Sequence, residues 1–107
     1  MRFVVLGAGS IGQRHVRNAL TLGHEVSAVF DPSQARLDEV LSIVPAGCLL
    51  TSVEEQVLDR EADAVIVCSP SSEHVRQARA AVGRGRHVLV EKPLSHTLDG
   101  TAELVGE

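Results

Sequence analysis

The residues best suited to chemistry begin with a glycine-rich segment, Gly7-Ala8-Gly9-Ser10-Ile11-Gly12, which directly follows a short apolar run. Gly7 would allow a tight turn out of the preceding strand, and Gly12 would let the helix pack closely on the sheet. Gly9 would let the main chain approach a diphosphate, because a Cβ there would block the ligand. A helix that begins here adds free N–H groups and the positive end of its dipole. We therefore expect a diphosphate to be bound by Gly7, Gly9, Ser10, Ile11 and Gly12. The alternative is a glycine turn that serves packing alone.

An acidic residue follows the glycine segment at a sequence spacing that suits contact with a bound nucleotide. Asp31 comes 19 residues after Gly12, at the end of a second apolar run. A carboxylate there can accept hydrogen bonds from both hydroxyls of an adenosine ribose and repels a 2′-phosphate, which favours NAD over NADP. Arg36 weakens this preference, because its side chain could reach a 2′-phosphate. Asp31-Pro32 also fits the start of a helix, and the two roles are compatible.

Two more polar segments follow apolar runs, and both contain residues that could serve a ligand. Ser69, Pro70 and His74 follow the run at 64–68, where we expect them to contact the cofactor. Ligands of open parallel sheets bind where strand order reverses, at the carboxyl ends of the strands. Lys92 follows the run at 88–90 and could donate a hydrogen bond to a substrate oxygen or move a proton. The alternatives are an exposed His74 and a solvent-facing Lys92 paired with Glu91.

The elements that position these residues alternate regularly. Apolar runs that suit buried strands occupy residues 3–6, 26–30, 48–50, 64–68 and 88–90. Helical periods lie between them, and a last helix is expected from about Thr97. Five β-α units with right-handed crossovers predict an α/β fold, a doubly wound parallel sheet with strand order 3-2-1-4-5.

Local signals fix where we expect the helices to start and what they bury. Asp31-Pro32 predicts the start of a helix that runs to Val44, and Ser52 with Glu55 predicts a capping box. That box opens a short helix burying Val53 and Val57. The segment at residues 69–72 is expected to cap the following helix. Its buried face is predicted to carry Val75, Ala78 and Val82.

Composition limits the remaining classes of function. The chain has 107 residues, enough for one domain, with 44% hydrophobic and 22% charged residues. A net charge of -4 and 2% aromatic residues argue against nucleic acid as a partner. No apolar run is long enough to span a membrane. Cys48 and Cys68 lie too far apart for a zinc motif, so we predict no metal site, two buried thiols and a reducing cytoplasm.

Together the glycine segment, Ser69-Pro70 with His74, and Glu91-Lys92-Pro93 resemble the glucose–fructose oxidoreductase/inositol dehydrogenase (Gfo/Idh/MocA) family. The resemblance covers essentially the whole chain, and Glu91-Lys92-Pro93 is its discriminating motif. Ser69 is a mild departure, since the family usually has threonine or a similar small residue there. The resemblance implies a Rossmann domain of an NAD(P)-dependent oxidoreductase that acts on sugars, cyclitols or related compounds.

The same resemblance implies roles for single residues. Lys92 would be the catalytic-site lysine that contacts substrate, Glu91 would help to bind the cofactor, and His74 would lie near the nicotinamide ribose. The family's second domain and the sixth strand are absent from this sequence. We therefore expect residues 1–107 to be the cofactor-binding half of a longer enzyme, with little turnover alone and with self-association possible at the sheet edge. The alternatives are a stand-alone nucleotide-binding module without catalysis and a domain that binds another nucleotide, such as CoA.

Overall fold

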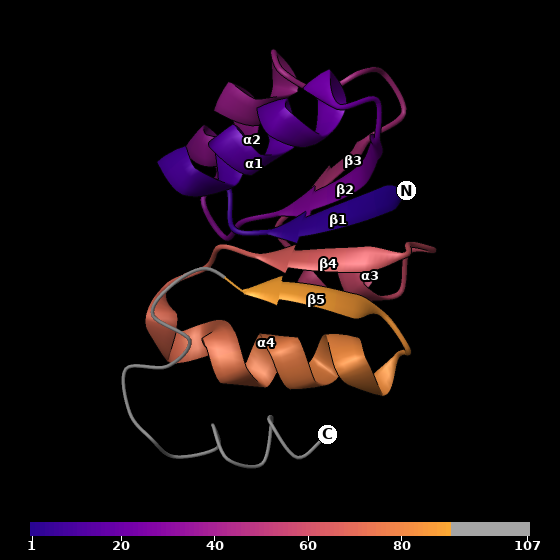
Figure 1. Ribbon diagram of the computed structural model, residues 1–107. Helices are drawn as coiled ribbons and strands as arrows, with labels where there is room; N and C mark the ends of the chain where they lie inside the picture. Colours follow the sequence, from indigo (N-terminus) through magenta and orange to yellow (C-terminus); the bar gives the residue numbers. More distant parts are fainter. Residues whose placement is uncertain (91–107) are drawn as a thin grey trace.

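The strands form from short segments rich in valine, whose branched side chains suit a sheet buried on both faces. The computed structural model describes residues 1–90. In that range the strands are β1 (Arg2–Leu6), β2 (Glu25–Phe30), β3 (Leu49–Thr51), β4 (Ala64–Val67) and β5 (His87–Val90). All pair in parallel, in the order β3-β2-β1-β4-β5 (Figure 1). The predicted doubly wound sheet and its strand order are confirmed.

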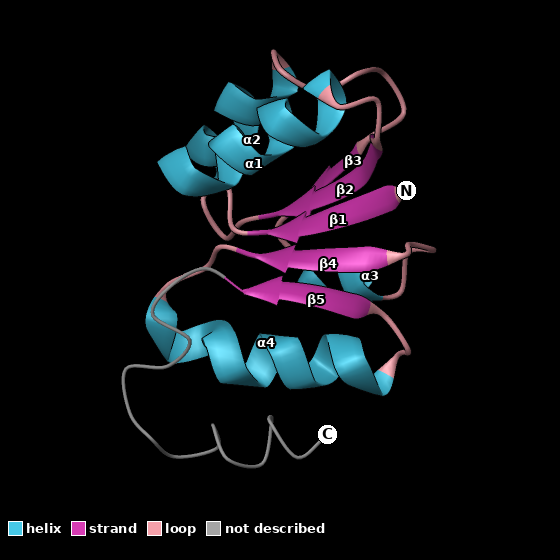
Figure 2. Cartoon of the chain, viewed as in Figure 1, coloured by secondary structure: helices cyan, strands magenta, loops and turns pink. Residues whose placement is uncertain are grey.

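The described helices are α1 (Ser10–Thr21), α2 (Gln34–Leu41), α3 (Glu54–Leu58) and α4 (Ser71–Gly83). Figure 2 shows α1 and α2 on one side of the sheet and α3 and α4 on the other. Two separate cores match these layers: Val16 and Val40 pack with Val5, whereas Val57 and Ala81 pack with Val4. Within residues 1–90, no helix has the length and apolar character needed to cross a membrane.

The strand register brings the carboxyl ends of the central strands to one edge of the sheet. Leu6, the last residue of β1, pairs with Phe30 of β2 and with Val67 of β4. Val67 in turn pairs with Val90 of β5. The segments that follow these strands therefore start side by side, and they contain most of the predicted site residues. Glu91, Lys92, Pro93 and the helix expected from Thr97 lie outside the described residues.

The starts of α2 and α3 differ from the prediction. Ser33, not Asp31, is the N-cap of α2, and its side chain accepts a hydrogen bond from the amide of Arg36. The helix ends at Leu41 rather than Val44. Asp31 does not cap α2, because its carboxylate accepts hydrogen bonds from the amide of Ala8 and from the amide of Ser33, which lies two residues after Asp31.

The capping box predicted at Ser52 and Glu55 is also wrong. Val53 is the N-cap of α3 and is 48% exposed, without a side-chain cap. Thr51, rather than Ser52, binds the start of the helix. Its Oγ1 accepts a hydrogen bond from the amide of Val53 at 3.0 Å and donates one to Oε1 of Gln56 at 2.7 Å. Because Thr51 ends β3 and is buried, the helix start is fixed by the strand before it.

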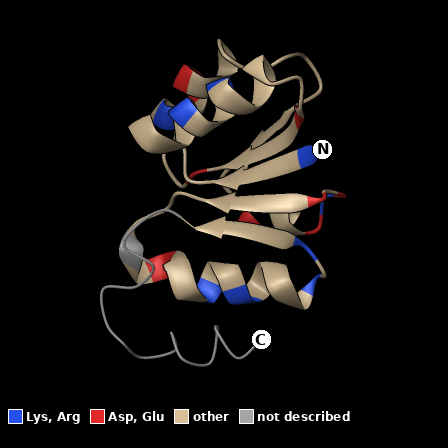
Figure 3. Ribbon diagram, viewed as in Figure 1, with Lys and Arg blue, Asp and Glu red and all other residues tan. Residues whose placement is uncertain are grey.

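Helix α4 starts within the predicted segment 69–72, and its buried face agrees with the prediction only in part. Pro70 is the N-cap and no side chain caps the helix. Ala78 is buried as predicted, but Val82 is exposed, and the inner face also holds His74, Gln77 and Ala81. On the outer face, basic residues lie along the helix (Figure 3). One of them, Arg76, bonds both carboxylate oxygens of Glu54 and ties α4 to α3.

The origin of α3 gives a first prediction. Thr51→Val should lower the free energy of unfolding by about 1 kcal/mol, because it removes the hydroxyl that serves both Val53 and Gln56. Ser52→Ala is the matched control and should change stability by no more than about 0.5 kcal/mol. Urea denaturation of both variants is the measurement. A larger loss of unfolding free energy for Ser52→Ala than for Thr51→Val would contradict this assignment and support the predicted capping box.

Candidate functional site

The glycine segment turns sharply against β4. Gly7 has φ +105°, a conformation that side chains disfavour. A Cβ at Gly7 would also lie 2.6 Å from the carbonyl carbon of Cys68 and from the amide nitrogen of Ser69. The Gly7 amide donates to the carbonyl of Phe30 at 2.7 Å. The turn is therefore packed between β2 and β4, and only glycine fits at its first position.

The first turn of α1 packs just as closely on that turn. A Cβ at Gly12 would lie 1.9 Å from the carbonyl oxygen of Gly7, which is far inside the contact distance. Gln13 adds a second attachment, since its Nε2 donates to the carbonyl of Ala8 at 3.0 Å. Gly12 thus permits the helix to begin immediately beside the strand it leaves, as the sequence predicted.

Gly9 is different, because the protein leaves space around it. Among the described residues, only the guanidinium group of Arg36 lies within 4 Å of a Cβ at Gly9, at 3.8 Å for its Nη1. Packing alone therefore gives no reason for glycine here. The open space lies at the start of α1, where a bound ligand could approach the main chain.

The N-terminus of α1 is left uncapped. Gly9 is the N-cap, so no side chain caps the helix, and the first turn contains no acidic residue. Within residues 1–90, the amides of Gly9, Ser10, Ile11 and Gly12 have no hydrogen-bond acceptor. Ser10 and Ile11 are exposed. The amides of residues 9–12 and the positive end of a twelve-residue helix therefore lie at a helix start where Ser10 and Ile11 are exposed, which suits an anion.

Asp31 lies beside this turn but is almost fully buried, with 2% of its surface exposed. Its Oδ2 accepts the amide of Ala8 and its Oδ1 accepts the amide of Ser33, both at 2.8 Å. The guanidinium group of Arg36 lies 3.8 Å from Oδ2. Sequence reasoning placed Asp31 at this edge correctly but missed its bond to Ala8.

Across the turn, Ser69, Pro70 and His74 form the segment after β4. Pro70 is exposed, whereas Ser69 and His74 are buried, with 7% and 2% exposure. His74 Nε2 forms a hydrogen bond with the carbonyl oxygen of Ser69. The exposed His74 considered from the sequence is therefore wrong, and the ring holds the turn between β4 and α4. The hydroxyl of Ser69 is buried, and no hydrogen-bond partner for it lies in the part of the chain that the structure describes.

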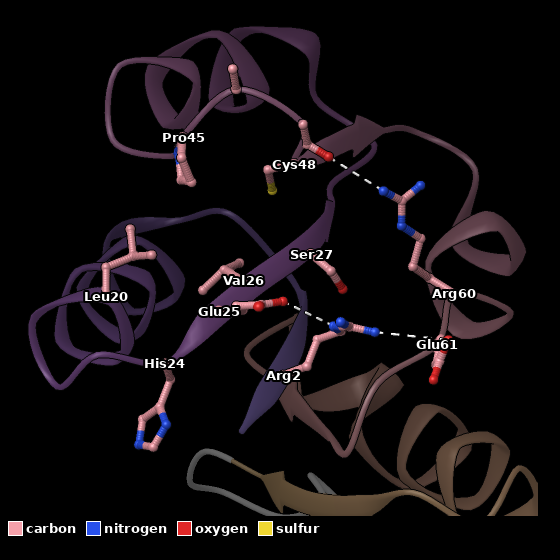
Figure 4. Close-up of a pocket in the computed structure, with 12 residues that line it drawn as sticks. Arg2, Leu20, His24, Glu25, Val26, Ser27, Pro45, Cys48, Arg60 and Glu61 are labelled. Carbon is pink, nitrogen blue, oxygen red and sulfur yellow. Dashed lines mark hydrogen bonds and ion pairs between the residues drawn. The ribbon is translucent and has the colours of Figure 1, made fainter.

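A surface cavity of about 570 Å³ lies at the opposite, amino-terminal edge of the sheet (Figure 4). None of the predicted site residues within the range 1–90 lines it. Three of its charged side chains form ion pairs: Arg2 lies 3.0 Å from Glu25 and 3.8 Å from Glu61. Burial raises the pKa of the Cys48 thiol to about 11, so this half-buried side chain stays protonated near neutral pH. The cavity therefore offers no thiolate near neutral pH.

The remaining chemistry of the described residues is modest. No group of histidine, cysteine and acidic side chains within residues 1–90 could hold a metal ion. Cys48 and Cys68 are both half-buried rather than fully buried as predicted. The uncapped start of α1 is thus the feature that points most directly to a ligand.

Comparison with known proteins agrees with this geometry. A family model described as "Oxidoreductase family, NAD-binding Rossmann fold" matches residues 1–107. The chain belongs to the Gfo/Idh/MocA oxidoreductase family. It is 31% identical over 107 residues to an inositol 2-dehydrogenase of Rhodococcus erythropolis, covering 98% of this chain and 31% of that protein. It is also 36% identical over 103 residues to D-xylose 1-dehydrogenase (NADP(+)) 2 of Haloferax volcanii. That match covers 95% of this chain and 32% of the Haloferax protein.

A solved structure extends the likeness to three dimensions. The WlbA dehydrogenase from Bordetella pertussis, in complex with NADH and UDP-GlcNAcA, has a TM-score of 0.87 and 27% sequence identity. The match covers 98% of this chain and 32% of that one. The chain thus spans about a third of the length of these Gfo/Idh/MocA relatives, and the portion it matches carries the NAD-binding Rossmann fold.

The contact between Gly12 and Gly7 gives the second prediction. Gly12→Ala should lower the free energy of unfolding by about 1–3 kcal/mol or more, because helix α1 must move away from the turn. Gly83→Ala is the control at the end of α4, where a Cβ meets nothing within 4 Å. That variant should be neutral or more stable by up to about 1 kcal/mol. Equal urea midpoints for the two variants would show that the close approach is absent.

Proposed function

We propose that this chain binds NAD through the uncapped start of α1. The observation that carries the proposal is the open space over Gly9 together with the free amides of residues 9–12. A diphosphate is the group that suits them, since it can accept several N–H bonds and its charge matches the helix dipole. The adjoining edge of the sheet is where strand order reverses. Ligands of open parallel sheets bind at such an edge.

NAD is proposed in preference to NADP. The Asp31 carboxylate lies at the end of β2, on the side where the adenosine ribose would bind, and it disfavours a 2′-phosphate. NADP is the alternative, because the Arg36 guanidinium lies 3.8 Å from Asp31 and offsets part of that charge. The name of the Haloferax relative, which includes NADP(+), supports this alternative.

At the other end of the cofactor, the segment after β4 would bind the nicotinamide half. Ser69, Pro70 and His74 fit this position because they follow the strand next to β1, with Ser69 in contact with the glycine turn. His74 would act by holding the carbonyl of Ser69 rather than by touching the ligand. Glu91 would complete this half of the pocket, in agreement with the family resemblance.

The reaction proposed for the whole protein is hydride transfer between a nicotinamide cofactor and a sugar, cyclitol or related alcohol. The bound nicotinamide would supply the hydride acceptor or donor. Lys92 would donate a hydrogen bond to the substrate oxygen and exchange its proton. Val90, two residues before Lys92, ends β5 beside Val67 at the ligand edge. The names of the inositol, xylose and UDP-GlcNAcA relatives support this substrate class. A cytoplasmic location and a homo-oligomer remain expectations from the sequence.

A titration with Gly9→Ala tests cofactor binding. The wild-type chain should bind NADH saturably and more tightly than NADPH. Gly9→Ala should weaken NADH binding at least tenfold, because the new methyl group occupies the space meant for the diphosphate. The fold should persist, since only the flexible end of Arg36 is near. The measurement is nicotinamide fluorescence, with circular dichroism as the control. Tighter binding of NADPH would reverse the cofactor preference, and unchanged binding by Gly9→Ala would remove the proposed diphosphate site.

The role of Lys92 is tested by separating binding from turnover. Lys92→Ala should leave the NADH affinity of the chain within about twofold, since the lysine is assigned to the substrate. In an active protein that contains this chain, the same change should lower kcat by about 100-fold or more. Steady-state kinetics with a saturating substrate provide the measurement. A wild-type kcat in the variant would exclude Lys92 from the proton path.

A further inference from the structure

The first two amides of the glycine turn both donate hydrogen bonds to residues at the end of β2. Gly7 donates to the carbonyl of Phe30 at 2.7 Å, and Ala8 donates to Oδ2 of Asp31 at 2.8 Å. Ala8 is fully buried, so its N–H group has no access to water and needs this acceptor. The two bonds fix the direction in which the chain leaves the turn. The next four amides, from residues 9 to 12, are the ones left for a ligand.

Asp31 is poorly placed to be only a ribose ligand. With 2% exposure it presents almost no surface to a cofactor, and each of its oxygens already accepts a main-chain amide. A hydrogen bond to a carboxylate is stronger than one between neutral groups. The Ala8 bond is therefore a firm attachment of the turn, and it joins the turn to the start of the next β-α connection through Ser33.

We propose that Asp31 is a positioning residue for the diphosphate site: its carboxylate holds the Ala8 amide so that the amides of residues 9–12 face the ligand. This inference rests on the proposed function and deepens it. It predicts that Asp31 affects every ligand that bears a diphosphate, whether or not the ligand has ribose hydroxyls. A residue that only forms hydrogen bonds with the ribose would affect the binding of ligands that have those hydroxyls and no others.

The test pairs a protein change with a ligand change. Asp31→Asn preserves the size of the side chain but has only one acceptor oxygen, so it cannot accept the amides of both Ala8 and Ser33. Calorimetry would compare ADP with 2′,3′-dideoxyadenosine diphosphate, which lacks both ribose hydroxyls. The variant should lose about tenfold or more in affinity for both ligands, by the same factor within about twofold. A loss for ADP with wild-type affinity for the dideoxy ligand would overturn the proposal.

A matched control and a second readout keep this test independent of cofactor binding. Ser33→Ala removes the cap of α2 but leaves the Ser33 amide and Asp31 in place, so it should not change either affinity. Hydrogen exchange of the Ala8 amide should be about tenfold or more faster in Asp31→Asn than in the wild type or in Ser33→Ala. An unchanged Ala8 rate would overturn the positioning role. If the wild type bound neither ligand, the proposed function would fail, and the exchange rates would still decide the role of Asp31.

The wild type alone provides a third measurement in case Asp31→Asn does not fold. In the isotope-labelled wild type, the Ala8 amide nitrogen should show a scalar coupling to the Asp31 carboxyl carbon through the hydrogen bond that joins the two groups. Absence of that coupling would overturn the proposal.

Discussion

The structure depends on the very close approach of the glycine turn to β4 and of helix α1 to that turn. Cβ atoms at Gly7 and Gly12 would lie 2.6 Å and 1.9 Å from the main chain beside them. This contact allows α1 to begin only four residues after β1 ends, with its N-terminus at the edge where strand order reverses. If the turn were wider, the free amides would lie away from the strand ends and the two halves of a dinucleotide site would separate.

Around that contact the site is built mostly from main-chain groups. The turn is attached to β2 through Phe30 and Asp31, and the segment after β4 is held by the bond between His74 and the Ser69 carbonyl. Asp31 and His74 are both buried and act inside the protein, whereas the start of α1 presents uncapped main-chain amides. As proposed, such a site would recognise the diphosphate, a group that dinucleotides share. The relatives that match this domain have different names: an inositol 2-dehydrogenase, a D-xylose 1-dehydrogenase and the WlbA dehydrogenase.

Patterns that arise from periodicity and from glycine spacing predicted the structure well. The five strands, their order and the roles of Gly7 and Gly12 follow from apolar runs and from contacts that no other residue permits. The errors concern polar side chains with several possible partners. Asp31 and Ser33 both resemble caps, as do Thr51 and Ser52, and the sequence does not show which one faces a buried amide. Val82 was misplaced because the helix pattern alone did not fix which face of α4 meets the sheet, and the same ambiguity left an exposed His74 open as an alternative.

The most direct test of this account is a titration of the isotope-labelled chain with NADH, followed through its amide resonances. The account predicts saturable shifts that are largest for Gly9, Ser10, Ile11 and Gly12, with small changes at the amino-terminal cavity around Gly47 and Arg60. Saturable shifts confined to that cavity, or no saturable shift at residues 9–12, would contradict the claim that these amides bind the diphosphate.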